Sequence, residues 1–108
     1  MAISYSKLGE THTTLGDLDK ALAFYEDFSK LEKQLYDSYP SNVGYKNGLA
    51  ISYLQLGRFY HYNRPDLAKA RSYYEQCQQL YMALTTSFPL YAKFKNNLAW
   101  VEERLGSL

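Results

Sequence analysis

The chain repeats its own sequence at a period of 48 to 49 residues. The tetrapeptide Ala-Ile-Ser-Tyr begins at Ala2 and again at Ala50, an offset of 48, whereas Pro40 and Pro89 lie 49 residues apart. A third, partial copy begins near Lys95. Self-similarity at a fixed period of this size is the signature of a repeat architecture in which every unit is one supersecondary element. The repeat therefore constrains the fold more tightly than the composition does.

The first unit has the pattern of two helices. Large residues at steps of three and four predict a helix over residues 2–15, which ends at Gly16. Asp17 is a suitable N-cap for a second helix, whose continuous apolar stripe runs over residues 18–38. Pro40 follows this stripe, and the residue before a proline is disfavoured in a helix. We therefore expect a helical hairpin.

The second unit has the same pattern, and the third copy supplies only one helix. Helices are predicted over residues 42–62 and 67–87, with Asp66 as the N-cap of the second. The last predicted helix covers about residues 90–105, and it carries Glu102 where the earlier units carry tyrosine. Terminal repeats need a polar outer face for solubility. We expect this helix to cap the array at its C-terminus.

The composition argues against several classes of partner. A chain of 108 residues fits one domain with its own core. Lys and Arg number 12 against 11 Asp and Glu, so the net charge is +1 and no electrostatic footprint for nucleic acid is present. The sequence has neither a run of 18 apolar residues nor a secretory signal, which predicts no membrane association. The single cysteine, Cys77, fits a reducing compartment, and we expect a cytoplasmic location.

The sequence contains no motif with a catalytic or cofactor-binding pattern. It has no glycine-rich phosphate loop, no Ser/His/Asp or Cys/His pairing at a suitable spacing, and no cluster of carboxylates on one helix face. Two histidines and one cysteine are too few for a structural zinc site. We therefore expect no enzymatic activity, no cofactor and no metal site.

The two units resemble the tetratricopeptide repeat. The shared order is an aromatic residue, a Leu-Gly pair, another aromatic, an alanine and a further aromatic ahead of a proline. The small residues in this order let the two helices of a unit approach closely. The usual period of about 34 residues is exceeded here, because both helices of a unit are longer. The order is carried by Tyr5, Leu8, Gly9, His12, Ala21 and Tyr25 in the first unit, and by Tyr53, Leu56, Gly57, Tyr60, Ala70 and Tyr74 in the second.

The resemblance implies an all-α domain of antiparallel helix hairpins. These would stack as a right-handed superhelix of five helices, made of two hairpins and a C-terminal capping helix. Repeat 1 would span residues 1–40, repeat 2 residues 41–89, and the capping helix residues 90–108. Residues 43–49, ahead of the second Ala-Ile-Ser-Tyr, have no counterpart before Ala2. We therefore expect the chain to be the C-terminal fragment of a longer array.

The resemblance also implies a protein-protein interaction scaffold. In the family, a concave surface lined mainly by the first helix of each unit binds a peptide or helix of a partner protein. One subgroup grips a C-terminal carboxylate with Lys and Asn side chains, but Ser6 and Glu10 stand at the first-helix positions here, so that clamp is not expected. The alternative is a structural segment that stacks on upstream repeats, or forms a homo-oligomer, through its exposed N-terminal edge. Register places on the predicted binding surface Ile3, Ser6, Glu10, Thr13, Ile51, Leu54, Arg58, His61, Asn96, Trp100 and Glu103.

Three side chains have two interpretations each. Trp100 either completes the core against the preceding helix or stands in the groove as an aromatic anchor, the residue type that dominates interface energetics. Cys77 occupies a position where the family has a small alanine, so a buried and unreactive side chain is expected rather than a reactive thiol. His61 lies near a predicted helix end, where a surface position is expected, although register also places it on the predicted binding surface.

Overall fold

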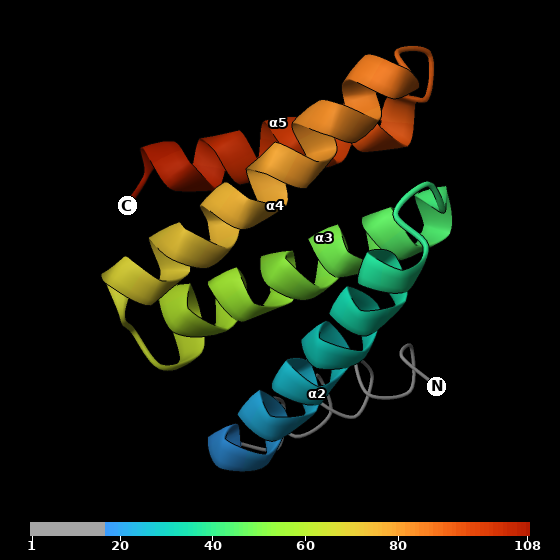
Figure 1. Ribbon diagram of the computed structural model, residues 1–108. Helices are drawn as coiled ribbons and strands as arrows, with labels where there is room; N and C mark the ends of the chain where they lie inside the picture. The colour runs from blue at the N-terminus through green and yellow to red at the C-terminus, as the bar shows by residue number, and fades with distance from the viewer. Residues whose placement is uncertain (1–16) are drawn as a thin grey trace.

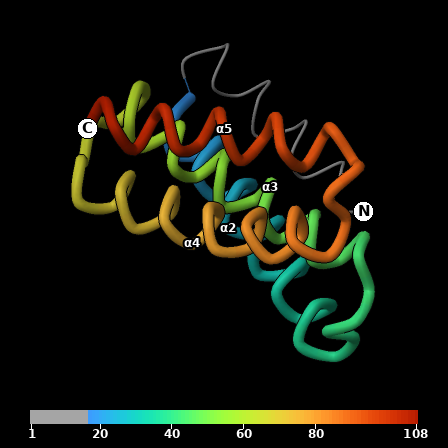
Figure 2. Tube along the Cα trace, turned by 90° about the horizontal axis from the view of Figure 1, so that it is seen from above, coloured from blue at the N-terminus to red at the C-terminus, as the bar shows by residue number. Residues whose placement is uncertain are grey.

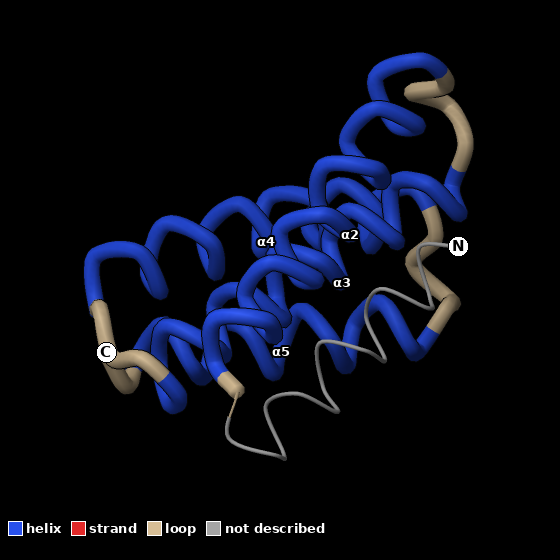
Figure 3. The backbone as a smooth tube through the Cα atoms, turned by 90° about the horizontal axis from the view of Figure 1, so that it is seen from below, coloured by secondary structure: helices blue, strands red, loops and turns tan. Residues whose placement is uncertain are grey.

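The computed structural model describes residues 17–108, which form helices with short connections and no strand (Figure 1 and Figure 3). The predicted all-α class is confirmed for this part of the chain. The helix predicted over residues 2–15 lies outside the described residues, so the five-helix superhelix and the repeat boundaries remain predictions. The elements are α2 (Leu18–Ser38), α3 (Val43–Arg58), the π-helical turn η1 (Phe59–Asn63), α4 (Leu67–Ser87) and α5 (Ala92–Gly106).

Polar side chains fix where α2, α3 and α4 begin. The Asp17 carboxylate accepts a hydrogen bond from the third backbone amide of α2 at 3.3 Å, and the Asp66 carboxylate does the same for α4 at 3.2 Å. Asn42 caps α3 in the same way, at 3.0 Å. Each cap satisfies one of the amides that a helix start leaves without an intrahelical partner. The predicted starts and ends of α2 and α4 are confirmed, and Leu67 lies 49 residues after Leu18.

The structure differs from the predicted helices at two places. One α-helix was expected over residues 42–62, but α3 ends at Arg58 and the chain continues as the π-helical turn η1. The Arg64 amide donates to the Phe59 carbonyl at 2.9 Å, five residues back, which is the hydrogen bond of a π-helix. The last helix begins at Ala92, two residues later than predicted, and Tyr91 ahead of it makes no side-chain cap.

The helices pack in the order of the chain. Helix α3 lies between α2 and α4, and α5 packs against α4 (Figure 1). The turns that join α2 to α3 and α4 to α5 lie at one end of the molecule, whereas η1 and the C-terminus lie at the other (Figure 2). Aromatic and aliphatic side chains of all these elements share one core. Its largest fully buried members are Tyr74, Tyr81, Phe59, Leu56, Leu84 and Val101.

Small residues allow α3 and α4 to approach closely. A Cβ atom at Gly57 would lie 2.5 Å from the Tyr74 ring, a separation that real Cβ atoms do not show. Ala21 on α2 and Ala70 on α4 are fully buried at the equivalent positions of their helices. The predicted role of Gly57 in close helix packing is therefore confirmed, and the full burial of Ala70 agrees with it. Gly9, and the helix that Ala21 is predicted to approach, lie outside the described residues.

Candidate functional site

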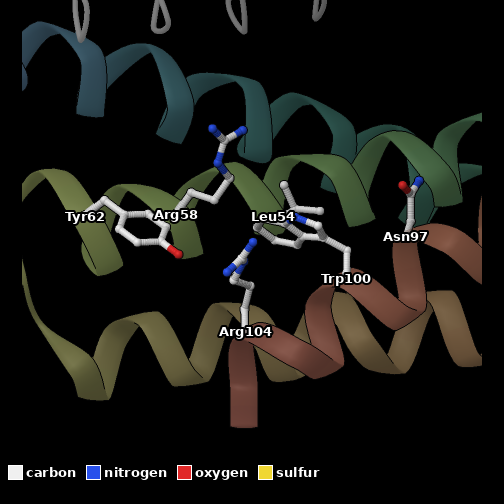
Figure 4. Close-up of a pocket in the computed structure, with 6 residues that line it drawn as sticks. All are labelled: Leu54, Arg58, Tyr62, Asn97, Trp100 and Arg104. Carbon is white, nitrogen blue, oxygen red and sulfur yellow. The ribbon is translucent and has the colours of Figure 1, made fainter. Parts of the chain in front are cut away.

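A groove runs between the C-terminal half of α3 and helix α5. It has a volume of about 520 Å³ and is open to solvent along one side. Figure 4 shows its walls: three side chains come from α3 and η1, and three from α5. We call it the α3–α5 groove and define it by the residues that line it among those the structure describes: Leu54, Arg58, Tyr62, Asn97, Trp100 and Arg104.

Trp100 belongs to both the core and the groove. Its ring meets the buried Tyr74 ring edge to face, with centroids 6.1 Å apart. The Arg104 guanidinium carbon lies 4.7 Å from the indole centroid, a cation–π distance. The indole is half-buried and lines the groove. The two interpretations of Trp100 are therefore not exclusive, because the core contact holds the ring in place while its remaining surface is open to the groove.

The charges of the groove are all of one sign in the described part of the chain. Arg58 and Arg104 line it, and no carboxylate does. The ion pairs found within residues 17–108 lie elsewhere and involve neither arginine. Burial raises the pKa of Tyr74 to about 12, and both guanidiniums oppose this rise, which places their charges near the same ring. The groove therefore combines two cationic groups with the apolar surfaces of Leu54 and Trp100.

The π-helical turn η1 decides which aromatic side chain reaches the groove. His61 turns inward, where its Nδ1 atom lies 3.2 Å from the Tyr74 hydroxyl. The Tyr62 ring stacks on the His61 ring with centroids 4.1 Å apart, and 53% of its surface is exposed. A π turn holds one more residue than an α turn, so the residues within it take different positions around the helix axis than they would in an α-helix. Tyr62 consequently occupies the groove wall.

Hydrogen bonds connect the α5 side of the groove to the buried Tyr81 on α4. Asn97 Nδ2 donates to the Tyr81 hydroxyl at 3.1 Å, and that hydroxyl donates to Asn47 Oδ1 at 3.0 Å. Tyr81 is fully buried, and burial raises its pKa. The network joins α3, α4 and α5, so the spacing between the two groove walls depends on a buried group whose hydrogen bonds are satisfied.

The structure brings together part of the predicted binding surface. Leu54, Arg58 and Trp100 line the α3–α5 groove. Ile51 and His61 are half-buried, Asn96 and Glu103 are exposed, and these four residues do not line the groove. Sequence reasoning missed three lining residues, which are Tyr62, Asn97 and Arg104. The remaining predicted residues, Ile3, Ser6, Glu10 and Thr13, lie outside the described part of the chain.

A second, apolar hollow of about 400 Å³ lies at the other end of the molecule. Its lining residues come from the start of α3, from the turn between α4 and α5, and from the first turn of α5. Leu90 in this turn has 97% of its surface exposed, and Tyr91 has 52%. The hollow carries no charged lining residue among those described. Its lining consists of Val43, Gly44, Asn47, Phe88, Tyr91 and Phe94.

The structure also shows where Cys77 lies. The side chain is fully buried, as predicted, and burial raises the pKa of its thiol to about 12. It is therefore a packing residue at neutral pH, because the reactive form is the thiolate.

Residues 17–108 contain no group of three or more His, Cys, Asp or Glu side chains arranged to hold a metal ion. No helix in that range has the length and apolar character that a membrane crossing requires.

Comparison with known protein families adds one finding. Residues 2–35 match the family model of the tetratricopeptide repeat. The chain contains a tetratricopeptide repeat. The match takes in most of α2 together with residues ahead of the described part. Tetratricopeptide repeats serve in general as non-catalytic scaffolds for protein-protein interaction. No curated protein and no solved structure matches the chain.

Proposed function

We propose that this chain is an interaction scaffold that binds a peptide or helix of a partner protein in the α3–α5 groove. The observation that carries the proposal is the half-buried Trp100, which is held by Tyr74 and presents its remaining surface to a groove of about 520 Å³. A rigid aromatic side chain loses little conformational freedom on binding, and tryptophan and arginine are the residue types enriched at interface hot spots.

The proposed surface extends beyond the groove. It includes four further residues on the same elements as the lining residues, which are Ile51, His61, Asn96 and Glu103. Their contribution is expected to be smaller, because residues around a buried anchor mainly exclude water. Ile3, Ser6, Glu10 and Thr13 belong to the proposal by register with the tetratricopeptide repeat.

The proposal is tested by selection of peptides and by cross-linking. A phage library of sixteen-residue random peptides is panned on the chain, and the peptides retained are synthesised. The photoreactive residue benzoylphenylalanine is then placed at Tyr62 in the groove or at Tyr39, which is similarly exposed but belongs to the turn between α2 and α3. Both side chains have more than half of their surface exposed, so neither replacement disturbs the core.

We expect the retained peptides to cross-link from position 62 and not from position 39. If no peptide is retained, or if position 39 captures peptides as well as position 62 does, the groove is not the binding surface.

A second candidate function is self-association as a structural segment. The exposed Phe88, Leu90 and Tyr91 favour it, because contiguous exposed apolar side chains are typical of interaction surfaces. Light scattering over a hundredfold range of concentration tests it. A mass that rises with concentration, and stays that of one chain in a Leu90→Asp, Tyr91→Asp variant, would support self-association through this end. A constant mass of one chain would exclude it.

A further inference from the structure

We infer that the α3–α5 groove selects a segment in which a carboxylate side chain, Asp or Glu, lies next to a large apolar side chain. This inference rests on the proposed function and goes beyond it, because it states which chemistry the groove recognises. It follows from the position of two arginines around an apolar floor.

Arg104 is placed to bind an anion. Its guanidinium lies over the Trp100 ring and is half-buried, so it has already lost part of the hydration that a carboxylate would displace. Its Nε atom is buried and has no hydrogen-bond acceptor within residues 17–108. The planar guanidinium offers parallel N–H groups that match the two oxygens of a carboxylate. In Figure 4 this group reaches from α5 toward α3, across the groove.

Arg58 supplies a second positive charge from the other wall. Its side chain is exposed and lines the groove. Arg58 and Arg104 both act to lower the pKa of Tyr74, so both charges lie near that ring, and both residues line the groove. Two like charges near one site repel each other, and an anion bound near both relieves that repulsion.

The described residues supply no counter-charge inside the groove. Lysine or arginine pairs with a carboxylate at three other places, at Lys20, Lys33 and Arg64. Glu103 is close in sequence to Arg104, but it is exposed and does not line the groove. The chain as a whole is almost neutral, with a net charge of +1. The concentration of positive charge is therefore a local property of the groove.

The apolar part of the site is formed by Leu54 and Trp100. Both are half-buried and pack against the core from the groove floor. The groove volume lies within the usual range of ligand pockets. A large apolar side chain of the partner would bury the remaining surface of Leu54 and Trp100, and burial of apolar surface is favourable. A neighbouring carboxylate would then reach the guanidinium that lies over the same indole.

A peptide is favoured over a nucleic acid by the geometry of the indole. Base recognition by stacking needs a free aromatic face. The Arg104 guanidinium lies over the Trp100 ring, and the Tyr74 ring meets it edge to face. The nearly neutral chain also lacks the basic surface that phosphate backbones require.

The test compares peptides and chain variants in a double-mutant cycle. The peptides retained in the phage selection are first inspected for Asp or Glu within two positions of an aromatic or aliphatic residue. The tightest one is then synthesised with each Glu replaced by Gln, or by phosphoserine. All versions are titrated into the wild-type chain, into Arg104→Gln and Arg58→Gln, and into Arg71→Gln. The last variant is the control, because Arg71 is exposed on α4 and does not line the groove.

We expect the Glu-to-Gln peptide to bind the wild-type chain and Arg71→Gln about tenfold more weakly, the size of one charge-assisted hydrogen bond. The same peptide change should cost less than threefold in Arg104→Gln, and Arg58→Gln should show a smaller coupling of the same sign. A thermal melt of each variant checks that the chain remains folded.

Two results would overturn the inference. Retained peptides that cross-link from position 62 but show no enrichment of acidic residues would leave the proposed function standing and remove the carboxylate preference. A phosphoserine version that binds where the glutamate version does not would show that the arginines recognise phosphate instead.

Discussion

The pair of helices α2 and α3 and the pair α4 and α5 place different residues at the same point of their contact. In the first pair, the carboxylate of Glu32 is buried against Gly48, and its Oε2 atom has no partner within residues 17–108. In the second pair, 49 residues later, Tyr81 contacts Asn97 and completes a hydrogen-bond chain to Asn47. The same position therefore holds a buried carboxylate oxygen without a hydrogen-bond partner in the first pair, among the described residues, and a hydroxyl that both donates and accepts a hydrogen bond in the second.

The difference shows what the repeat preserves and what it leaves free. At this contact the helical backbone and the burial of Glu32 and Tyr81 are kept, because each helix must fit against the next one. Side-chain chemistry is not kept. The second pair has the better buried polar contact, and it also carries the groove wall with Trp100 and Arg104. The network at Tyr81 therefore supports the part of the molecule that we propose to bind.

The largest effect is expected at the two equivalent glycines, Gly57 and Gly106. A Cβ at Gly57 would strike the buried Tyr74 ring, whereas nothing lies within 4 Å of a Cβ at Gly106. Gly57→Ala should lower the free energy of unfolding by about 2 to 3 kcal/mol through overpacking. Gly106→Ala should leave it unchanged or raise it by about 0.5 kcal/mol, since alanine is the better helix former. Urea denaturation measures the unfolding free energy of both variants, and equal changes would contradict the expected difference between the two glycines.

The next effect is expected at Tyr81. Tyr81→Phe keeps the ring and removes the hydroxyl, which leaves Asn47 and Asn97 without their shared partner. We expect a loss of about 1 to 2 kcal/mol in the free energy of unfolding, the cost of leaving these partly buried amide groups unpaired. A neutral Tyr81→Phe would show that the network does not stabilise the second pair.

A smaller effect is expected at the starts of α3 and α5. Asn42 caps α3, so Asn42→Ala should cost about 1 kcal/mol. Tyr91 stands at the same position before α5 and makes no cap, although its ring lies 4.6 Å from that of Phe94. Tyr91→Asn gains a cap and loses this ring contact, and the two changes are of similar size, so the net effect should stay within about 0.5 kcal/mol. Thermal unfolding of the two variants measures these changes, and a loss at Tyr91→Asn as large as that at Asn42→Ala would contradict the expectation.

The smallest effect is expected at Glu32, and it depends on pH. Burial raises the pKa of Glu32, so the folded chain holds this proton more tightly than the unfolded chain does. Stability contributed by the protonated group is present at pH 4 and is lost as the pH rises through the folded pKa. Relative to Glu32→Gln, the wild-type chain should therefore lose stability between pH 4 and pH 7. If the stability difference between the wild-type chain and Glu32→Gln does not vary with pH, the pKa of Glu32 is not raised by folding.

Much of the fold could be predicted because its signals are local. Asp17 and Asp66 are strong caps, each followed by an apolar stripe, and these features placed α2 and α4 correctly. The end of α3 could not be predicted in the same way. A π turn such as η1 differs from an α turn by one residue and has no pattern of its own in the sequence.

The site was less predictable for a related reason. Register with the tetratricopeptide repeat identified Leu54, Arg58 and Trp100 among the lining residues. Tyr62 was missed because the π turn rotates it into the place expected of His61. Asn97 and Arg104 were missed because the angle at which α5 crosses α4 determines which of its residues face α3. That angle depends on side-chain packing over the whole core, which no local pattern encodes.

The central claim is that a protein segment binds against Trp100 in the α3–α5 groove. Trp100 is the only tryptophan of the chain, so its fluorescence reports on the groove alone. The tightest peptide from the phage selection should change the emission of Trp100 in a saturable way, with the same dissociation constant that calorimetry gives. A peptide that binds in the calorimeter while the emission stays constant would contradict the claim.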